Sequence, residues 1–172
     1  MGLSNFVNGS EWINPLIKTF CQDTDDIFVD VGVNIGQTLL KVKTLLPEIK
    51  YVGFEPNVAC TFYTEQLLKI NQFRNCNIIN CALFSSNGLM KLLKNTQDDL
   101  AASIIISQRP NYFKTYNQII CTDFDSIFGN EQISFIKIDV EGAELDVLKG
   151  MVQSIKQCQP LILCEVLDSF SS

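Results

Sequence analysis

Short apolar runs alternate with segments of helical periodicity along most of this 172-residue chain. Five runs are nearly apolar throughout and predict buried strands, at residues 27–31, 51–55, 78–84, 133–140 and 161–166. Three segments between them predict helices, at about 37–46, 56–71 and 143–157. Strands that alternate with helices in this way form right-handed βαβ units. The pattern therefore predicts an α/β fold, with a doubly wound, mostly parallel sheet covered by helices on both faces.

Two parts of the chain depart from this alternation. Residues 1–26 are expected to form an N-terminal helical extension, with a helix over about 11–21, and residues 27–172 a single α/β domain. Residues 85–122 are interpreted as an insert within that domain. The short elements expected in and beside the insert are a hairpin turned at Asn87-Gly88 between Leu83-Phe84 and Leu89–Leu93, strands at 103–106 and 119–122, and a helical turn at 123–128.

The composition narrows the classes of protein that fit this pattern. A net charge of −6 without a basic run disfavours a nucleic-acid partner. Histidine is absent, which excludes His-based triads and most zinc sites. No window approaches the ~18 apolar residues of a membrane span. The seven cysteines are odd in number and lack a Cys-x-x-Cys pair, and no signal peptide precedes them, so we expect a reduced, cytoplasmic protein.

The first strand ends in a turn with two glycines, Asp30-Val-Gly-Val-Asn-Ile-Gly36. In an open α/β sheet, ligands bind beyond the carboxyl ends of the strands, where such turns lie. We expect Gly32 and Gly36 to let a ligand approach the backbone closely. A dinucleotide-binding turn would carry a glycine where Asn34 stands, and the carboxylate of Asp30 would repel a pyrophosphate. That carboxylate suits the cationic sulfonium and amine of S-adenosylmethionine, although a plain strand-to-helix turn is the alternative.

The second strand also ends in an acidic residue, Glu55. Its distance from the glycine turn is that at which a dinucleotide fold places the acid that binds the ribose hydroxyls. The alternative is a solvated carboxylate at the start of a helix opened by Pro56, where the helix dipole favours negative charge. We favour the ribose role because the acid and the turn occur together. Phe54 and Pro56 are expected to pack.

Lys137 and Asp139 lie two residues apart in the fourth strand, so their side chains share one face. A lysine in a buried strand is unfavourable unless it is paired. If the fourth strand lies between the first and the fifth, Asp30 and Glu165 are candidate partners for Lys137. A purely structural ion cluster is the alternative. Asp139 is the catalytic candidate, because it lies at the strand tip where a substrate hydroxyl can arrive.

Two glutamates follow this strand. Glu141 and Glu144 begin the next helix, where the helix dipole stabilises acidic side chains in any case. We keep Glu141 as a catalytic candidate beside Lys137 and Asp139, and we expect no role for Glu144. Asp139, Glu141 and Glu144 are alternatively ligands of a divalent cation, but the ligand set is incomplete and no metal site is predicted.

These motifs together resemble those of the FkbM-type methyltransferases, a branch of the S-adenosylmethionine-dependent Rossmann-like superfamily. The resemblance covers about residues 27–166 and is carried by the runs at 28–36, 52–57, 80–83, 136–145, 148–150 and 163–166, with Asp125 before the fourth strand. It implies a Rossmann-like sheet with the strands, numbered along the chain, in the order 3-2-1-4-5. The usual superfamily sheet adds an antiparallel hairpin after the fifth strand. We expect that hairpin to be missing here, as in a fragment or a minimal version with an uncovered sheet edge.

The resemblance implies S-adenosylmethionine as the cofactor, and a hydroxyl on a sugar, glycolipid or polyketide-like natural product as the methyl acceptor. The residues that would hold the cofactor are Asp30, Gly32, Asn34, Gly36, Glu55, Pro56, Asn57, Cys81, Ala82 and Leu83. The last three would lie near the adenine. Ser85 and Ser86 stand where family members often carry an acid that follows the third strand.

In this interpretation Asp139 accepts or orients the proton of the acceptor hydroxyl, and Lys137 holds that carboxylate or the nascent alkoxide. The part of the insert expected to select the acceptor is 95–117, with Ser103, Arg109 and Tyr112. Two rivals stay open. An NAD-dependent oxidoreductase is disfavoured by the missing middle glycine, and a non-catalytic domain that binds a nucleoside or a protein is the other rival.

Overall fold

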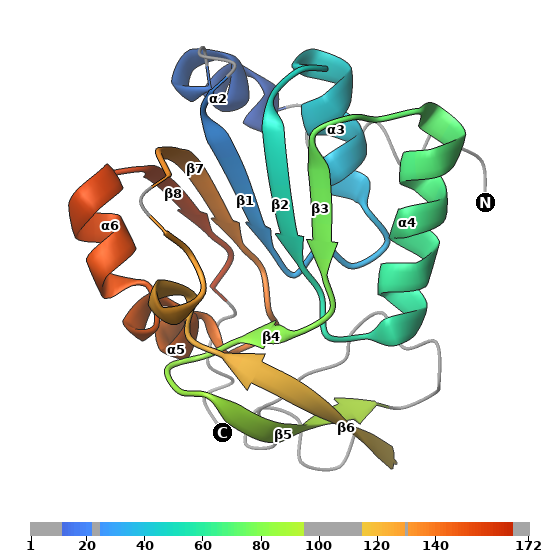
Figure 1. Cartoon of the computed structure of the whole chain (residues 1–172), viewed down its shortest axis with the longest axis vertical. Coiled ribbons are helices and arrows are strands. Elements are labelled where there is room, and N and C mark those ends of the chain that lie inside the picture. The colour runs from blue at the N-terminus through green and yellow to red at the C-terminus, as the bar shows by residue number, and fades with distance from the viewer. Residues whose placement is uncertain (1–11, 22–24, 95–114, 130, 167–172) are drawn as a thin grey trace.

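The structure is a computed structural model that describes residues 12–21, 25–94, 115–129 and 131–166. Its central feature is a five-stranded sheet in the order β3-β2-β1-β7-β8 (Figure 1). The strands are β1 (Ile27–Val31), β2 (Lys50–Phe54), β3 (Cys76–Ile79), β7 (Ile133–Ile138) and β8 (Leu161–Cys164). All four pairings are parallel. The predicted α/β fold and its strand order are therefore confirmed.

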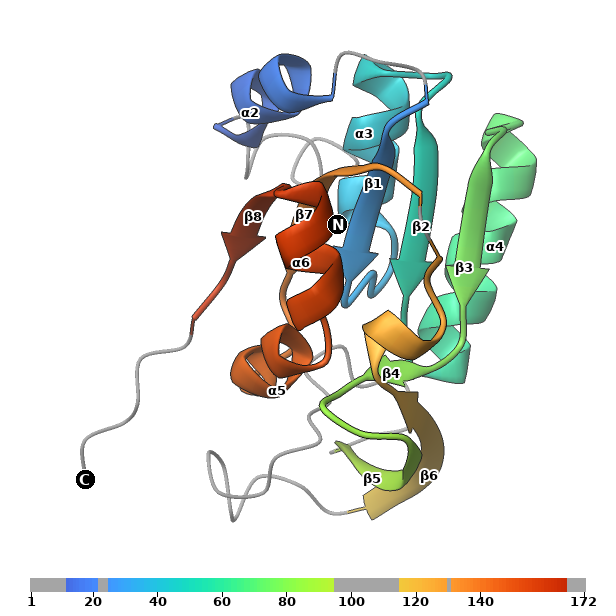
Figure 2. The same ribbon diagram turned by 60° about the vertical axis from the view of Figure 1, so that its left-hand side comes forward.

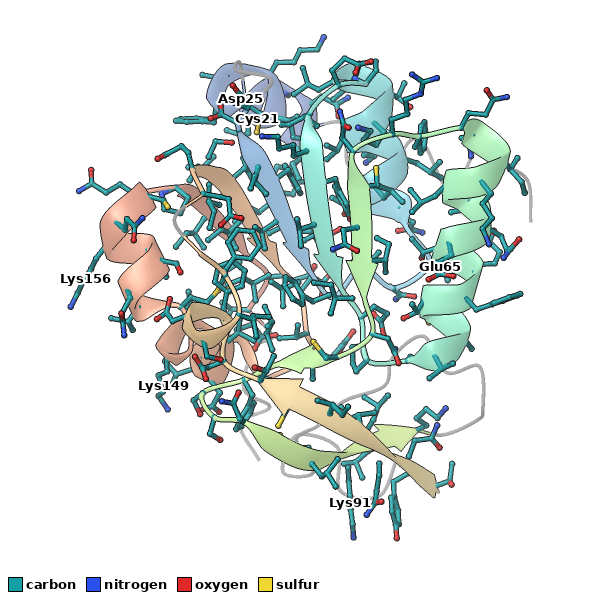
Figure 3. The ribbon with its side chains drawn as sticks, viewed as in Figure 1. Cys21, Asp25, Glu65, Lys91, Lys149 and Lys156 are labelled. Atoms are coloured by element: carbon teal, nitrogen blue, oxygen red, sulfur yellow. The ribbon has the colours of Figure 1, made fainter. Side chains whose placement is uncertain are left out.

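Helices cover both faces of this sheet, as Figure 2 shows. They are α2 (Ile13–Phe20), α3 (Gln37–Leu45), α4 (Val58–Asn71), α5 (Glu144–Lys149) and α6 (Val152–Cys158), with a short 3-10 helix η3 (Phe124–Ser126). Successive strand residues point to opposite faces, which gives two cores. Phe28 packs on the side of α2 and α3, whereas Val29 packs on the side of α5 and η3. Lys149 and Lys156 point away from the sheet, on the outer sides of α5 and α6 (Figure 3).

A second, three-stranded sheet lies beyond the carboxyl ends of the large sheet (Figure 1). Its order is β4-β6-β5, with β4 (Ala82–Leu83), β5 (Gly88–Lys94) and β6 (Thr115–Thr122). The predicted hairpin between Leu83-Phe84 and Leu89–Leu93 is wrong, because both β4 and β5 pair with β6 instead. The side chain of Asn87 explains this pairing. Its Oδ1 accepts hydrogen bonds from Thr122 Oγ1 (2.6 Å) and from the Asp123 amide (3.0 Å), which ties the turn to the end of β6.

The single strand predicted at 78–84 is two strands in different sheets. Two residues separate β3 from β4, and the first of them is Asn80. The Asn80 side-chain amide donates to the backbone oxygen of Glu55 (2.8 Å) and to Thr61 Oγ1 (3.0 Å). These bonds hold the chain against the start of α4, so it leaves the large sheet here although the sequence on both sides is apolar.

Three of the predicted strands end earlier than expected. β2 ends at Phe54, β7 at Ile138 and β8 at Cys164. Glu55 and Asp139 are therefore the first residues beyond their strands. Their side chains lie in the crevice at the carboxyl edge of the sheet, while their amides still donate backbone hydrogen bonds to the neighbouring strands.

The helix predicted over 143–157 is interrupted and forms α5 and α6. The break is at Gly150, where a Cβ atom would lie 2.1 Å from the backbone oxygen of Phe84. The carboxylate of Asp125 then accepts the amides of Gln153 and Ser154, both at 2.8 Å, and so satisfies the first turn of α6. Contacts with a distant loop and with η3, rather than local propensity, divide this helix.

No helix in the described part of the chain is long and apolar enough to cross a bilayer. Several predictions fall outside the described residues. These are the strand at 103–106, the selectivity candidates Ser103, Arg109 and Tyr112, and the chain beyond residue 166.

Replacing Gly150 by alanine should lower the free energy of unfolding by about 2–3 kcal/mol, because a backbone oxygen occupies the place of the new methyl group. Gly88→Ala is the matched control, since nothing lies within 4 Å of the place that its new methyl group would take, and the expected change is within about 0.5 kcal/mol. Urea unfolding followed by circular dichroism measures both. Equal stability of the two variants would contradict the close approach at Gly150.

Candidate functional site

Two neighbouring cavities lie at the carboxyl edge of the large sheet, in the crevice where ligands bind in open α/β folds. The residues that line the first cavity are Val31, Gly32, Asn34, Phe54, Glu55, Pro56, Asn57, Cys60, Cys81, Ala82, Leu83, Leu92, Asp139, Val140, Glu141 and Ala143. They come from the ends of β1, β2 and β7 and from β4 and β5 of the small sheet. The small sheet therefore closes one side of this cavity. We call it the inner cavity.

The second cavity, here called the outer cavity, has a volume of 540 Å³. The residues that line it are Trp12, Ile13, Gly32, Val33, Asn34, Gln37, Thr38, Lys41, Lys137, Ile138, Asp139, Leu163, Cys164 and Glu165. It lies between the starts of α2 and α3 and the ends of β7 and β8. Gly32, Asn34 and Asp139 line both cavities, so the two adjoin along one wall. A volume of this size lies in the usual range for small-molecule sites, about 300–1,000 Å³.

The carboxylate of Glu55 is fixed in the wall of the inner cavity by two backbone amides. Its Oε2 accepts from the Asn34 amide at 2.8 Å, and its Oε1 accepts from the Asn57 amide at 2.7 Å. One glutamate thereby joins the glycine turn after β1 to the start of α4. Each carboxylate oxygen has a second lone pair, so Glu55 can also accept hydrogen bonds from a ligand in the cavity.

The glycine turn is shaped by contacts within the protein. Gly32 has φ +85°, and a Cβ there would lie 1.9 Å from the backbone oxygen of Asp139. Gly36 has φ +83°, and its Cβ would meet Leu67 and Thr64 on α4 at 3.1 and 3.3 Å. The expectation that both glycines make room for a ligand stays a prediction. Their conformation and the close approach of neighbouring elements require glycine, and only Gly32 lines a cavity.

Lys137 is the centre of an ion cluster that joins β1 to β7. Its Nζ lies 3.4 Å from Asp30 Oδ1 and 3.2 Å from Asp139 Oδ2, and it donates to the backbone oxygen of Gly32 at 3.4 Å. Asp30 and Lys137 are direct neighbours in the register of the two strands. The other oxygen of Asp30 accepts a hydrogen bond from the hydroxyl of Tyr51 on β2. The predicted pairing of Lys137 with Asp30 is thus present. Glu165, the other predicted partner, lines the outer cavity together with Lys137.

The carboxylates of Asp30, Asp139 and Glu55 differ in how far they are exposed to solvent. The side chain of Asp30 is 0% exposed and lines neither cavity, whereas that of Asp139 is 35% exposed and lines both. Asp30 therefore contributes to the site only through its ion pair with Lys137. Asp139 is the member of the cluster that a bound molecule can reach. Glu55 is buried at the inner cavity and presents its oxygens to that space.

Burial sets the charge states of this cluster. Burial raises the pKa of the Asp30 carboxyl, and Lys137 and the Tyr51 hydroxyl oppose that rise only in part. Burial lowers the pKa of Lys137, but the charges of Asp30 and Asp139 outweigh it and raise the pKa above its ordinary value. Burial also raises the pKa of Glu55, against the effect of the two backbone amides. Lys137 is therefore a permanent cation at neutral pH and cannot accept a proton.

The remaining predicted residues fall into two groups. Pro56, Asn57, Cys81, Ala82, Leu83 and Glu141 all line the inner cavity. Glu144 lies outside both cavities, and its carboxylate accepts the Gly142 amide at 2.8 Å. In the described part of the chain, no group of three or more His, Cys, Asp or Glu side chains is placed to hold a metal ion.

Several residues of the site carry no motif that predicts them. Tyr51 donates a hydrogen bond to Asp30 from the neighbouring strand. Gly53 is paired with Asp30 across the two strands, and Tyr51 lies two residues before Gly53, so both point to the same face of the sheet as Asp30. The alternation of side chains along β2 could therefore have indicated Tyr51. Cys60 on α4 and Leu92 on β5 line the inner cavity without any signal in the local sequence. Trp12 lines the outer cavity from the start of α2.

The structure is thus a doubly wound α/β domain with a crevice, lined by acidic side chains, at the carboxyl edge of its sheet. Comparison with known families places the chain more narrowly, because residues 30–171 match the Methyltransferase FkbM domain. The chain belongs to this family.

Two curated relatives agree with that assignment. The chain is 26% identical over 162 residues to Methyltransferase sdnD of Sordaria araneosa, and 23% identical over 164 residues to Methyltransferase 1 of Beauveria bassiana (strain ARSEF 2860). These alignments cover 74% and 84% of this chain, but only 61% and 66% of the two relatives. The chain therefore spans less than two thirds of the length of either relative.

Two solved structures share the fold at 10% sequence identity. One is a candidate rRNA methylase from Clostridium thermocellum, with a TM-score of 0.54 over 88% of this chain and 64% of the other. The second is precorrin-6y C5,15-methyltransferase from Geobacter metallireducens GS-15, with a TM-score of 0.51 over 92% and 63%. At this identity they support the Rossmann-like fold alone.

Replacing Lys137 by methionine should lower the free energy of unfolding by about 3–5 kcal/mol at neutral pH, because the buried carboxylate of Asp30 loses its cation. The folded state then binds a proton on Asp30 more tightly than the unfolded state does. The stability of the variant should therefore rise as the pH falls through the raised pKa of Asp30. Urea unfolding at several pH values measures this dependence.

Two further variants control this experiment. Adding Asp30→Asn to Lys137→Met should recover most of the loss, because no buried charge then remains unpaired. Lys149→Met removes an exposed partner of Asp146 and should change stability by about 0.5 kcal/mol or less. A Lys137→Met variant as stable as Lys149→Met would contradict the role given to the ion cluster.

Proposed function

We propose that this chain transfers a methyl group from S-adenosylmethionine to a hydroxyl group of a small acceptor, and that this acceptor is a sugar, a glycolipid or a natural product. Membership of the FkbM family and the names of both curated relatives, each a methyltransferase, support the reaction class. The observation that carries the proposal is the position of Asp139. It lines both cavities and is held by Lys137, between the place for a cofactor and the place for an acceptor.

The inner cavity fits the nucleoside part of this cofactor. Glu55 presents two oxygens that are already aligned by the Asn34 and Asn57 amides, and two adjacent ribose hydroxyls are suitable donors to them. Apolar walls for a flat base are provided by Phe54, Leu83, Leu92 and Val140. A pyrophosphate, by contrast, would meet the carboxylates that line this space.

The charge of the site fits the cationic end of the cofactor. One ammonium group, that of Lys137, lies among the carboxylates of Asp30 and Asp139, so the cluster has an excess of negative charge. Glu55 and Glu141 add acidic groups to the inner cavity. A sulfonium and an amine are therefore attracted to the wall that the two cavities share.

When bound, S-adenosylmethionine would supply an electrophilic methyl group and would leave as S-adenosylhomocysteine as the bond between its sulfur and that carbon breaks. Asp139 orients the acceptor hydroxyl and accepts its proton as the oxygen becomes bonded to carbon. Lys137 keeps the Asp139 carboxylate in place and stabilises negative charge that develops on the acceptor oxygen. Since both groups are fixed to the rigid end of β7, a large part of the acceleration comes from alignment of the reactants.

A hydroxyl is a better candidate than a nucleic-acid base for the accepting group. The net charge of the chain is −6, and it has no basic run to bind a phosphate backbone. Methyltransferases that act on the amino groups of bases would usually show Asn or Asp, two prolines and an aromatic residue after the fourth parallel strand. Here Val140-Glu-Gly142 follows Asp139 instead.

The test is Asp139→Asn, measured in parallel for turnover and for cofactor binding. With a panel of hydroxylated acceptors, formation of S-adenosylhomocysteine should fall by about 100-fold or more, because the variant cannot take the proton. Affinity for S-adenosylmethionine should fall far less than turnover, because Glu55 and Glu141 still attract the cationic cofactor. Asp146→Asn is the matched control, since Asp146 also pairs with a lysine but lies outside both cavities. Undiminished turnover, or an equal loss of binding and turnover, would refute the assignment.

A further inference from the structure

The outer cavity has one wall residue that the fold itself does not explain. Trp12 is the only tryptophan of the chain, lies at the start of α2 and is 59% exposed. Single exposed apolar side chains are common on protein surfaces and need no explanation by themselves. This one, however, lines the same cavity as Asp139, Lys137 and Glu165.

The helix that bears Trp12 is firmly anchored. Ile13, Ile17 and Cys21 are buried in the core that α2 shares with α3 and the sheet. The start of the helix is therefore fixed relative to the ends of β7 and β8. This anchoring holds Trp12 as a part of the cavity wall, next to Ile13, which lines the cavity too.

The helix gains nothing locally from a tryptophan at this position. Trp12 is the N-cap residue of α2, and its side chain makes no capping hydrogen bond. Its backbone is helical, with φ −61° and ψ −25°, and not in the extended conformation of a residue whose side chain caps a helix. A large flat side chain that neither caps the helix nor packs in its core is available to a ligand in the outer cavity.

The outer cavity has no excess of basic side chains. Its basic side chains are Lys41 and Lys137, and its acidic side chains are Asp139 and Glu165. Asp30 lies directly beneath Lys137 and adds a further negative charge. There is no excess of positive charge here to bind an anionic acceptor. Gln37 and Thr38, at the start of α3, provide uncharged hydrogen-bonding groups instead.

We propose that the outer cavity is the acceptor subsite, and that Trp12 selects uncharged acceptors with a flat ring by stacking against that ring. The proposal rests on the function proposed above and adds the acceptor class and a specificity-determining residue to it. A ring stacked on Trp12 and hydrogen-bonded to α3 would present its hydroxyl to Asp139 across the cavity. An acceptor with a carboxylate would add a negative charge to a site whose acidic side chains, with Asp30, already outnumber its two lysines, so it would bind less tightly.

The experiment uses two probes of nearly the same shape, para-hydroxybenzamide, which is uncharged, and para-hydroxybenzoate, which is anionic. Calorimetry measures their affinity for the full chain saturated with S-adenosylhomocysteine, and the fluorescence of the single tryptophan reports binding next to Trp12. The variants are Trp12→Ala and Trp12→Phe. Phe20→Ala is the control, because Phe20 is an exposed aromatic residue on the same helix and does not line the outer cavity.

We expect the amide to bind more tightly than the carboxylate and to change the tryptophan fluorescence. Trp12→Ala should weaken amide binding by about tenfold, Trp12→Phe should restore most of it, and Phe20→Ala should leave it unchanged. S-adenosylhomocysteine affinity should be the same in all variants. Amide binding that is absent, weaker than that of the carboxylate, or insensitive to Trp12→Ala would overturn this inference while leaving the proposed reaction intact. A folded wild-type chain that binds no S-adenosylhomocysteine would overturn both.

Discussion

The ammonium group of Lys137, whose side chain is 14% exposed, determines how the carboxyl edge of the sheet is built. A lysine in a parallel strand that is packed on both faces requires negative partners, and it finds them in its register neighbour Asp30 and in Asp139 two residues further on. Tyr51 on the next strand completes the arrangement by donating to Asp30. Three adjacent strands are thereby joined through side chains at the point where the backbone ladder ends. The only well-exposed carboxylate of this cluster belongs to Asp139, and it faces the space where ligands bind.

The same edge explains why there are two cavities rather than one. Asp139 and the turn at Gly32 approach so closely that no side chain fits between them, and together they form the wall that the cavities share. On one side of this wall, Glu55 and the small sheet enclose a space suited to a nucleoside. On the other side, α2 and the start of α3 border a larger and more evenly charged space. In the proposed reaction, donor and acceptor would therefore meet at Asp139 without competing for one pocket.

The large sheet could be predicted from the sequence because each of its strands is almost wholly apolar. Two residues of the candidate site, Glu55 and Asp139, could be predicted because they directly follow such strands. The errors share a different cause. The break at Asn80, the pairing set by Asn87 and the helix interruption at Gly150 all depend on contacts with segments far away in the chain. No local pattern of apolar and polar residues records such contacts. For the same reason, the close approach of Asp139 to Gly32 and of α4 to Gly36 could not be read from the sequence.

The most direct test of this account is a calorimetric titration of the chain with S-adenosylmethionine and, separately, with NAD, repeated for Glu55→Ala. The account predicts saturable binding of S-adenosylmethionine alone. It also predicts that Glu55→Ala, which removes the acceptor of the ribose hydroxyls, weakens this binding by about tenfold or more. Binding of NAD, or S-adenosylmethionine binding that is insensitive to Glu55→Ala, would contradict the assignment of the inner cavity. A folded chain that binds neither molecule would support a non-catalytic domain instead.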